Sequence, residues 1–260
     1  MTSMIAFWIS QLASRMPSAA MHGVRKIQSG RAAGLSLVCP RNADPRFEAG
    51  TYEMPIQDAI AEMLSPGDVF FDIGANLGFF SLVAARAVGP EGRVYAFEPV
   101  PRNADAIRRC RNINNLPWID VFVEAVGASS GKADMWIAKH PGGSALASAD
   151  TPPDRLRKAN VDLVSLDDAI AERGLRPPNL IKIDVEGAEH EVLEGLAKTL
   201  LAANPALLCE VDDATEEGLD RKRRELSETL VRSGYRVRVL PLSYDASEWH
   251  VAHLLATWPA

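Results

Sequence analysis

The segment that most constrains the fold is residues 72–78, Asp-Ile-Gly-Ala-Asn-Leu-Gly, which follows the apolar run Val69-Phe70-Phe71. A buried strand, a glycine-rich turn and a helix start, in this order, are typical of the nucleotide-binding unit of an open α/β sheet. Glu98 follows twenty residues after Gly78, at the end of the next predicted strand, where an acidic residue can bind ribose hydroxyls. The sequence therefore predicts a site for a nucleoside cofactor.

The glycine spacing narrows the choice of cofactor. A dinucleotide needs G-x-G-x-x-G to bring its pyrophosphate onto the helix N-terminus. Counted from Gly74, the second and third glycine positions are Asn76 and Phe79. No G-K-[ST] follows either, which excludes a Walker A loop. A nucleoside without a phosphate, such as S-adenosylmethionine, fits this turn better, with Asp72 supplying negative charge near its amino-acid tail.

From residue 69 onward, short β-branched or aromatic runs alternate with longer helical segments. This alternation is typical of a doubly wound α/β fold with buried parallel strands. The predicted strands cover residues 69–73, 93–97, 120–126, 180–185 and 207–211. The predicted helices cover residues 55–64, 79–88, 103–115 and 188–201.

Residues 127–160 and the C-terminus depart from this alternation. Residues 127–160 are rich in glycine and proline, with one predicted strand at 135–138, and we expect an insertion that forms a loop or lid. Residues 235–242 and 249–258 read as two strands without a helix between them. Such a hairpin would place an antiparallel strand in an otherwise parallel sheet.

The whole sequence is divided into two predicted parts. Residues 1–65 are expected to form an N-terminal helical extension, and residues 66–260 the cofactor-binding domain with its insertion. The apolar run 4–9 is too short to span a bilayer, and no Lys or Arg precedes it as in a signal peptide.

Charge and cysteine usage restrict the partners. The net charge of −6 argues against nucleic acid, because phosphate binding needs a basic excess. The three cysteines are widely spaced and lack a C-x-x-C pair, which argues against a disulfide framework or a zinc site and for a cytoplasmic location. The expected partner is a small-molecule or glycan acceptor. The oligomeric state stays open, with a homodimer as one option.

Two blocks of the sequence resemble a known family. Residues 72–82 and Phe97-Glu98-Pro99 resemble the S-adenosylmethionine site of class I methyltransferases, and residues 180–189, Leu-Ile-Lys-Ile-Asp-Val-Glu-Gly-Ala-Glu, resemble the FkbM signature. The resemblance extends from about residue 52 to residue 211. It implies an S-adenosylmethionine-dependent O-methyltransferase that acts on a saccharide, glycolipid or polyketide hydroxyl. It also implies a seven-stranded Rossmann-like sheet with an antiparallel last strand.

The candidate cofactor-binding residues lie at strand ends, in the glycine turn or just before the first helix. They are Glu53, Asp72, Gly74, Asn76, Gly78, Glu98 and Glu124. A tight turn in which Asp72 only caps the next helix is the structural alternative.

The candidate catalytic residues follow the fourth strand. Asp184 is the first candidate for the base that deprotonates the acceptor, and His190 is the second. Lys182 shares a strand face with Asp184 because side chains alternate; a salt bridge that only orders the strand end is the alternative. Glu186 is expected to bind substrate or to favour the following helix N-terminus. For His190 the alternative is a surface residue paired with a neighbouring glutamate.

Metal and acceptor binding are less determined by the sequence. Asp184 and Glu210 have the placement of magnesium ligands, although Glu210 is equally suited to binding substrate. Ser144 in the insertion is a candidate for sugar binding. Two other classes of function stay open: an NAD(P)-dependent oxidoreductase, and a non-catalytic cofactor-binding domain.

Overall fold

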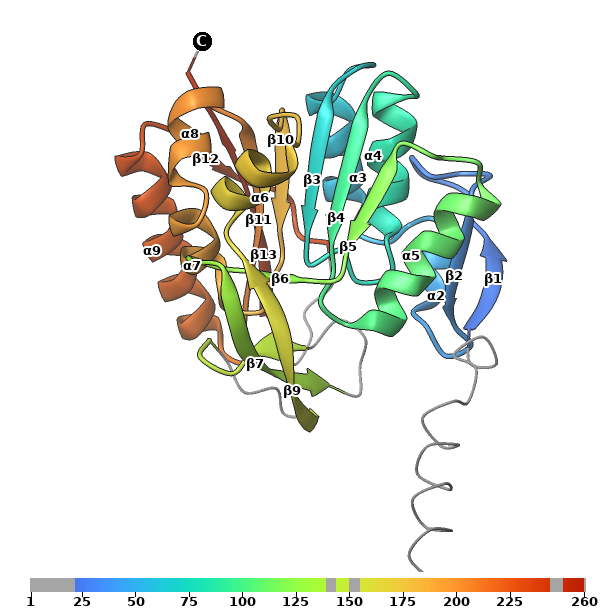
Figure 1. Cartoon of the computed structure of the whole chain (residues 1–260), viewed down its shortest axis with the longest axis horizontal. Helices are drawn as coiled ribbons and strands as arrows, with labels where there is room; N and C mark the ends of the chain where they lie inside the picture. The colour runs from blue at the N-terminus through green and yellow to red at the C-terminus, as the bar shows by residue number, and fades with distance from the viewer. Residues whose placement is uncertain (1–21, 139–143, 150–154, 244–249, 260) are drawn as a thin grey trace, which may run out of the picture.

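A mixed sheet of seven strands forms the centre of the computed structural model (Figure 1), which describes residues 22–138, 144–149, 155–243 and 250–259. The strand order is β12-β13-β11-β10-β3-β4-β5, and β13 is antiparallel to both of its neighbours. The strands are β3 (Val69–Ile73), β4 (Arg93–Phe97), β5 (Ile119–Phe122), β10 (Leu180–Ile183), β11 (Ala206–Asp213), β12 (Arg236–Val239) and β13 (His250–Thr257). The predicted α/β fold with an antiparallel C-terminal strand is confirmed.

Each face of this sheet is covered by its own set of helices. Phe70 points into a core formed with α3 (Met54–Met63), α4 (Phe79–Val88) and α5 (Pro101–Ile113). Its neighbour Phe71 points into a second core on the opposite face, as strand alternation requires. That core is closed by α6 (Leu166–Arg173), α7 (Glu189–Glu194), α8 (Ala197–Ala203) and α9 (Glu216–Arg232). With both faces covered, the strands are near-continuous apolar runs.

Two predicted elements are divided in the structure. The helix predicted over 188–201 breaks between α7 and α8 at Gly195, where a Cβ would lie 2.0 Å from the carbonyl oxygen of Gly127. The strand predicted over 120–126 ends at Phe122, and β6 (Ala125–Val126) joins a different sheet. In both places a tertiary contact overrides the local sequence pattern.

The described part of the insertion is a small sheet rather than a loop. Its strand order is β6-β9-β7-β8, with β7 (Gly131–Ala138) antiparallel to β9 (Arg155–Val164) and to the short β8 (Ala145–Leu146). Met135 and Ile137 of β7 pack in a third apolar cluster with Val100 and Ala188 of the main domain. Figure 1 shows β7 and β9 beyond the end of the sheet toward which β3 and β10 run.

A hairpin precedes the helices of the N-terminal part. β1 (His22–Lys26) pairs with β2 (Ser36–Pro40), and the short helix α2 (Pro45–Ala49) follows. The amide of Val38 donates to Cys110 Sγ of α5, which fixes the hairpin to the domain. Helical structure was therefore the wrong prediction for residues 22–40, while residues 1–21 lie outside the described part. The domain boundary at residue 66 stays a prediction.

The three cysteines, Cys39, Cys110 and Cys209, are buried and free. Among the described residues, none of the helices has the length and apolar character needed to cross a membrane.

Candidate active site

The turn between β3 and α4 needs glycine at two positions for two different reasons. At Gly74 (φ +76°) a Cβ would lie 1.8 Å from the backbone oxygen of Asp184, so the turn packs directly against the end of β10. At Gly78 (φ +79°), the residue that precedes α4, a Cβ would meet Ile107 at 3.0 Å. Asn76 between them also has a positive φ of 50°, which asparagine tolerates better than most residues.

Glu98 closes this turn from the end of β4. Its carboxylate accepts hydrogen bonds from the backbone amides of Asn76 and Val100, both at 2.8 Å, and from the side-chain amide of Asn103 at 3.4 Å. Burial raises the pKa of Glu98 to about 8, although these hydrogen bonds oppose the shift. The structure thus brings Glu98 to the glycine turn, as the sequence predicted.

Asp72 lies beneath the turn rather than on its surface. Its side chain is buried, and one oxygen accepts a hydrogen bond from the hydroxyl of Ser81 in α4. Burial raises the pKa of Asp72, while the neighbouring Lys182 lowers it. Ser81 was not among the predicted site residues. It lies nine residues after Asp72, in the first turn of α4.

A row of charged residues crosses four adjacent strands on the face covered by α3 and α4. Strand register places Lys182 beside Asp72, and Glu210 beside His253. Lys182 is 2% exposed, forms an ion pair with Asp184 at 2.7 Å and lies 5.0 Å from the ring centre of Phe80. Burial disfavours its charge, but the carboxylates of Asp184 and Asp72 raise the pKa of Lys182 above its usual range. Lys182 and Asp184 share a strand face as predicted, and they form the salt bridge that the sequence analysis gave as the alternative to a catalytic role.

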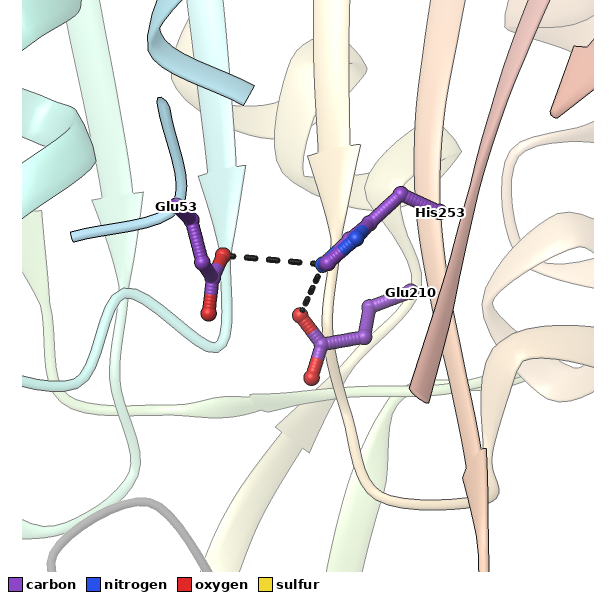
Figure 2. A group of neighbouring side chains, drawn as sticks. All are labelled: Glu53, Glu210 and His253. Atoms are coloured by element: carbon purple, nitrogen blue, oxygen red, sulfur yellow. Dashed lines mark hydrogen bonds and ion pairs between the residues drawn. The ribbon is translucent and has the colours of Figure 1, made fainter. Parts of the chain in front are cut away.

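His253 connects the far end of this row to the start of α3. Its Nε2 lies 2.8 Å from Glu210 Oε2 and 3.5 Å from Glu53 Oε2. Figure 2 shows the two carboxylates pointing at the same ring nitrogen from different parts of the chain. Burial lowers the pKa of His253, but the hydrogen bonds to Glu210 and Glu53 raise it to about 9 overall. The imidazole is therefore charged at neutral pH.

Other predicted site residues have different surroundings. Glu124 accepts two hydrogen bonds of 2.7 Å from Arg173, so an ion pair already engages its carboxylate. Ser144 accepts a hydrogen bond from the backbone amide of Ala138 and so terminates β7. His190 is exposed at the start of α7. In the insertion, residues 139–143, which directly precede Ser144, lie outside the described part.

Glu186 lies in a concentration of negative charge between β10 and α7. Its φ of 54° is positive, an uncommon conformation that is often found at functional sites. Burial first, and then the charges of Asp212, Asp184 and Glu210, raise the pKa of Glu186 well above its ordinary value. The residue therefore lies near the other carboxylates of this edge, and its catalytic assignment stays a prediction.

The two candidate magnesium ligands have different partners in the structure, and a magnesium site that they share stays a prediction. Asp184 forms the ion pair with Lys182, whereas Glu210 clusters with Glu53 and His253. In this cluster, one possible ligand atom from each residue lies within 4.8 Å of the others. Glu210 is thus shared between the predicted and the observed grouping.

Several buried polar atoms suit a ligand that carries hydrogen-bond donors. Within the described residues, Asp72 Oδ1, Asn76 Oδ1 and Asn103 Oδ1 are buried and have no hydrogen-bond partner. Buried acceptors without partners are rare in native proteins and call for an explanation. All three residues contact or adjoin the turn and Glu98, where the ribose and ammonium of S-adenosylmethionine would donate hydrogen bonds. The residues present therefore fit this cofactor.

Comparison with known proteins identifies the family. The methyltransferase FkbM domain matches residues 72–237, which include the glycine turn, Glu98 and the end of β10. The chain belongs to the FkbM methyltransferase family. The 31-O-demethyl-FK506 methyltransferase FkbM of Streptomyces tacrolimicus is 35% identical over 159 residues, covering 51% of this chain and 61% of the relative. The hexuronic acid methyltransferase AglP of Haloferax volcanii is 28% identical over 151 residues, covering 57% and 59%. The alignments thus span about three fifths of these two relatives.

A solved structure supports the fold of this FkbM domain. Fibrillarin of Aeropyrum pernix, solved with natively bound S-adenosyl-L-methionine, superposes with a TM-score of 0.52. The comparison covers 90% of this chain and 98% of fibrillarin at 15% identity. At this level of identity the likeness establishes a shared methyltransferase fold.

His253 was not among the site residues predicted from the sequence, although its ring lies between Glu53 and Glu210. The signal was a histidine inside the otherwise apolar run Ala252–Ala256. A polar residue at an inward strand position is normally paired, but its partners come from positions 53 and 210, which the sequence does not place together.

Proposed function

We propose that this FkbM domain is an S-adenosylmethionine-dependent O-methyltransferase that acts on a hydroxyl of a saccharide, glycolipid or polyketide-like acceptor. One observation carries the proposal. The segment that matches the family contains both the glycine turn bonded to Glu98 and the charged edge at Asp184 and Glu210, at the same end of the parallel strands. A cofactor and an acceptor can therefore meet there.

Within this proposal each group has a distinct task. When bound, S-adenosylmethionine supplies a methyl group on a good leaving group, so the protein must mainly align the acceptor and remove its proton. Glu98 binds the ribose hydroxyls, and the free oxygens of Asp72 and Asn76 accept hydrogen bonds from the ligand. Asp184, held by Lys182, and Glu210 face the acceptor. Glu186 adds negative charge to the same edge.

The relatives support a hydroxyl acceptor. One is named for 31-O-demethyl-FK506 and another for a hexuronic acid, so the family includes both polyketide-type and sugar-type acceptors. The small sheet of β6 to β9, which lies beyond the strand ends, is suited to selecting among such acceptors. Residues that bind different ligands are usually on variable segments that a rigid scaffold holds in place.

The test is transfer of a labelled methyl group from S-adenosylmethionine to a panel of hydroxyl compounds. The panel contains methyl glycosides of neutral hexoses, methyl glucuronide and a macrolide with a free secondary hydroxyl. We expect an O-methylated product with at least one class. Asp184→Asn should reduce turnover without weakening S-adenosylhomocysteine binding, which would also exclude a non-catalytic binding domain. Transfer that is unaffected by EDTA would exclude a role for magnesium.

The oxidoreductase alternative makes the opposite prediction. In that case NADH would bind, hydroxyl compounds would be oxidised, and no labelled methyl group would be found in the product. That pattern would contradict the proposed function.

A further inference from the structure

Glu53, His253 and Glu210 form a buried chain, the Glu53–His253–Glu210 unit, that ends at the acceptor-facing edge. The side chains of Glu53 and His253 are each 2% exposed, whereas that of Glu210 is 17% exposed. Asp184, which follows on the neighbouring strand, is 26% exposed. Glu210 is therefore the member of the unit that an acceptor can reach.

The distances within the unit place two carboxylates on the same ring nitrogen of His253, with Glu210 the nearer. His253 Nε2 is close to both carboxylates, and its Nδ1 lies 3.4 Å from the hydroxyl of Ser243. Each ring nitrogen thus has a polar neighbour, which fixes the orientation of the ring. Glu210 is held in turn by the ring, because a charged donor at 2.8 Å makes a strong hydrogen bond.

The charge balance favours a proton on His253 over a metal ion in this cluster. Lys182 is charged and interacts with both Glu210 and Glu53, and His253 is charged between the same two carboxylates. A divalent cation would have to displace the proton of His253 and lie near the Lys182 ammonium. Two buried cations already compensate these carboxylates, so the cluster does not require a metal ion to be stable.

We propose that Glu210 is the general base of methyl transfer and that His253, anchored by Glu53, is its positioning residue. This rests on the proposed function. The acceptor's hydroxyl proton moves to a Glu210 carboxylate oxygen, and the hydroxyl oxygen forms the new bond to the methyl carbon. The carbon–sulfur bond breaks, and its electron pair remains on sulfur.

The surroundings of Glu210 suit a base that works near neutral pH. Burial first, then the charges of Asp184 and Glu53, raise the pKa of Glu210 to about 7, while the hydrogen bond from His253 opposes the rise. Lys182 on β10 adds a positive charge and Glu186 a negative one. A base is most effective when its pKa is close to the working pH.

The first experiment measures kcat against pH with the acceptor that the methyl-transfer panel identifies. Glu210→Gln should lower kcat about 100-fold or more at every pH, the usual contribution of a general base, with S-adenosylhomocysteine affinity retained. His253→Gln keeps a donor but removes the charge, so the pKa of Glu210 should rise by about one unit. Its kcat should fall about fivefold at pH 7 and recover above pH 9.

Glu62→Gln is the matched control. Glu62 lies on α3, the helix that Glu53 precedes, but its side chain is exposed and forms an ion pair with Arg238. Its pH profile should equal that of the unmodified protein. If His253→Gln lowers kcat by the same factor at every pH, or Glu210→Gln retains more than a tenth of the activity, the proposal is wrong.

The second experiment needs no acceptor, so it remains informative if the panel yields no product. NMR titration of the histidine side chains should show His253 titrating near pH 9, and Glu210→Gln should move this titration down toward or below 6.5. The His253 signal is identified by its loss in His253→Gln. An unshifted His253 in the unmodified protein would overturn the proposal even if methyl transfer is observed. A shifted His253 with no methyl transfer would instead contradict the proposed function.

Discussion

At the scale of single residues, the site is defined by carboxyl groups that are largely buried. Glu98 is 4% exposed and receives two backbone amides, yet its pKa is raised to about 8 because burial penalises its charge. At neutral pH the group is therefore mostly protonated before a ligand binds. Ribose hydroxyls that donate to the ionised form would favour release of this proton.

This predicts that cofactor binding is linked to Glu98. S-adenosylhomocysteine affinity should increase between pH 6 and pH 9, and calorimetry in two buffers of different ionisation enthalpy should detect proton release on binding. Glu98→Gln should abolish the release and weaken binding about 10- to 100-fold, the range for lost hydrogen bonds to a charged group. The exposed Glu91→Gln on the preceding turn should leave both unchanged. Proton release retained in Glu98→Gln would assign the linkage to another group.

At the scale of elements, the glycine turn is set by the contact between two strands as much as by a ligand. Gly74 lies against the backbone of Asp184, so the turn after β3 and the end of β10 form two adjoining edges of the candidate site. A side chain here would separate the two edges. The conformation is also unfavourable for a residue with a Cβ, because φ is +76°.

Gly74→Ala should therefore combine a steric clash with backbone strain. We expect a loss of about 3 kcal/mol in unfolding free energy and no detectable S-adenosylhomocysteine binding. Gly174→Ala is the control, since Gly174, which follows α6, is also left-handed (φ 64°, ψ 35°) but has open space where the Cβ would be. That change should cost about 1 kcal/mol from strain alone and leave binding intact. Urea unfolding and calorimetry separate the two effects; equal losses would contradict the packing argument.

Among the elements, the buried strands could be predicted from the sequence, whereas an exposed strand could not. Strands with continuous apolar runs, such as 69–73 and 93–97, were found at their observed bounds because burial on both faces leaves a strong pattern. The exposed β9, with Arg155, Arg157 and Lys158 near its start, lacks that pattern and was missed. Elements stabilised mainly by pairing with a neighbour leave little local signal.

For the candidate site, too, residues at neighbouring strand ends could be predicted, whereas a pairing between distant segments could not. Asp72, Lys182 and Asp184 were predicted at one edge because parallel strands end together, and the structure brings them together. The pairing of His253 with Glu53 depends on contacts across two hundred residues of chain, which a single sequence does not reveal. Register of the antiparallel β13 is what places His253 opposite Glu210.

At the scale of the whole molecule, several buried groups favour their protonated forms. The pKa values are raised to about 8 for Glu98, about 7 for Glu189 and Glu210, and about 9 for His253. The folded chain therefore binds more protons than the unfolded chain between about pH 5 and pH 9. Stability must then fall as pH rises through this range.

The unfolding free energy of the cofactor-free protein should thus be higher at pH 6 than at pH 8.5. Urea unfolding at the two pH values measures the difference, with the midpoint lower at the higher pH. Glu98→Gln should reduce the pH dependence, because glutamine has no proton to lose. A midpoint that increases from pH 6 to pH 8.5 would show that these carboxyl groups are ionised in the folded state.

The central claim is that the 72–78 turn and Glu98 form a site for S-adenosylmethionine. Isothermal titration calorimetry at pH 8 with S-adenosylhomocysteine and, separately, with NADH tests it most directly. We predict micromolar binding of S-adenosylhomocysteine at one site per chain, lost in Gly74→Ala and retained in Gly174→Ala, with no binding of NADH. Micromolar binding of NADH without binding of S-adenosylhomocysteine would contradict the account.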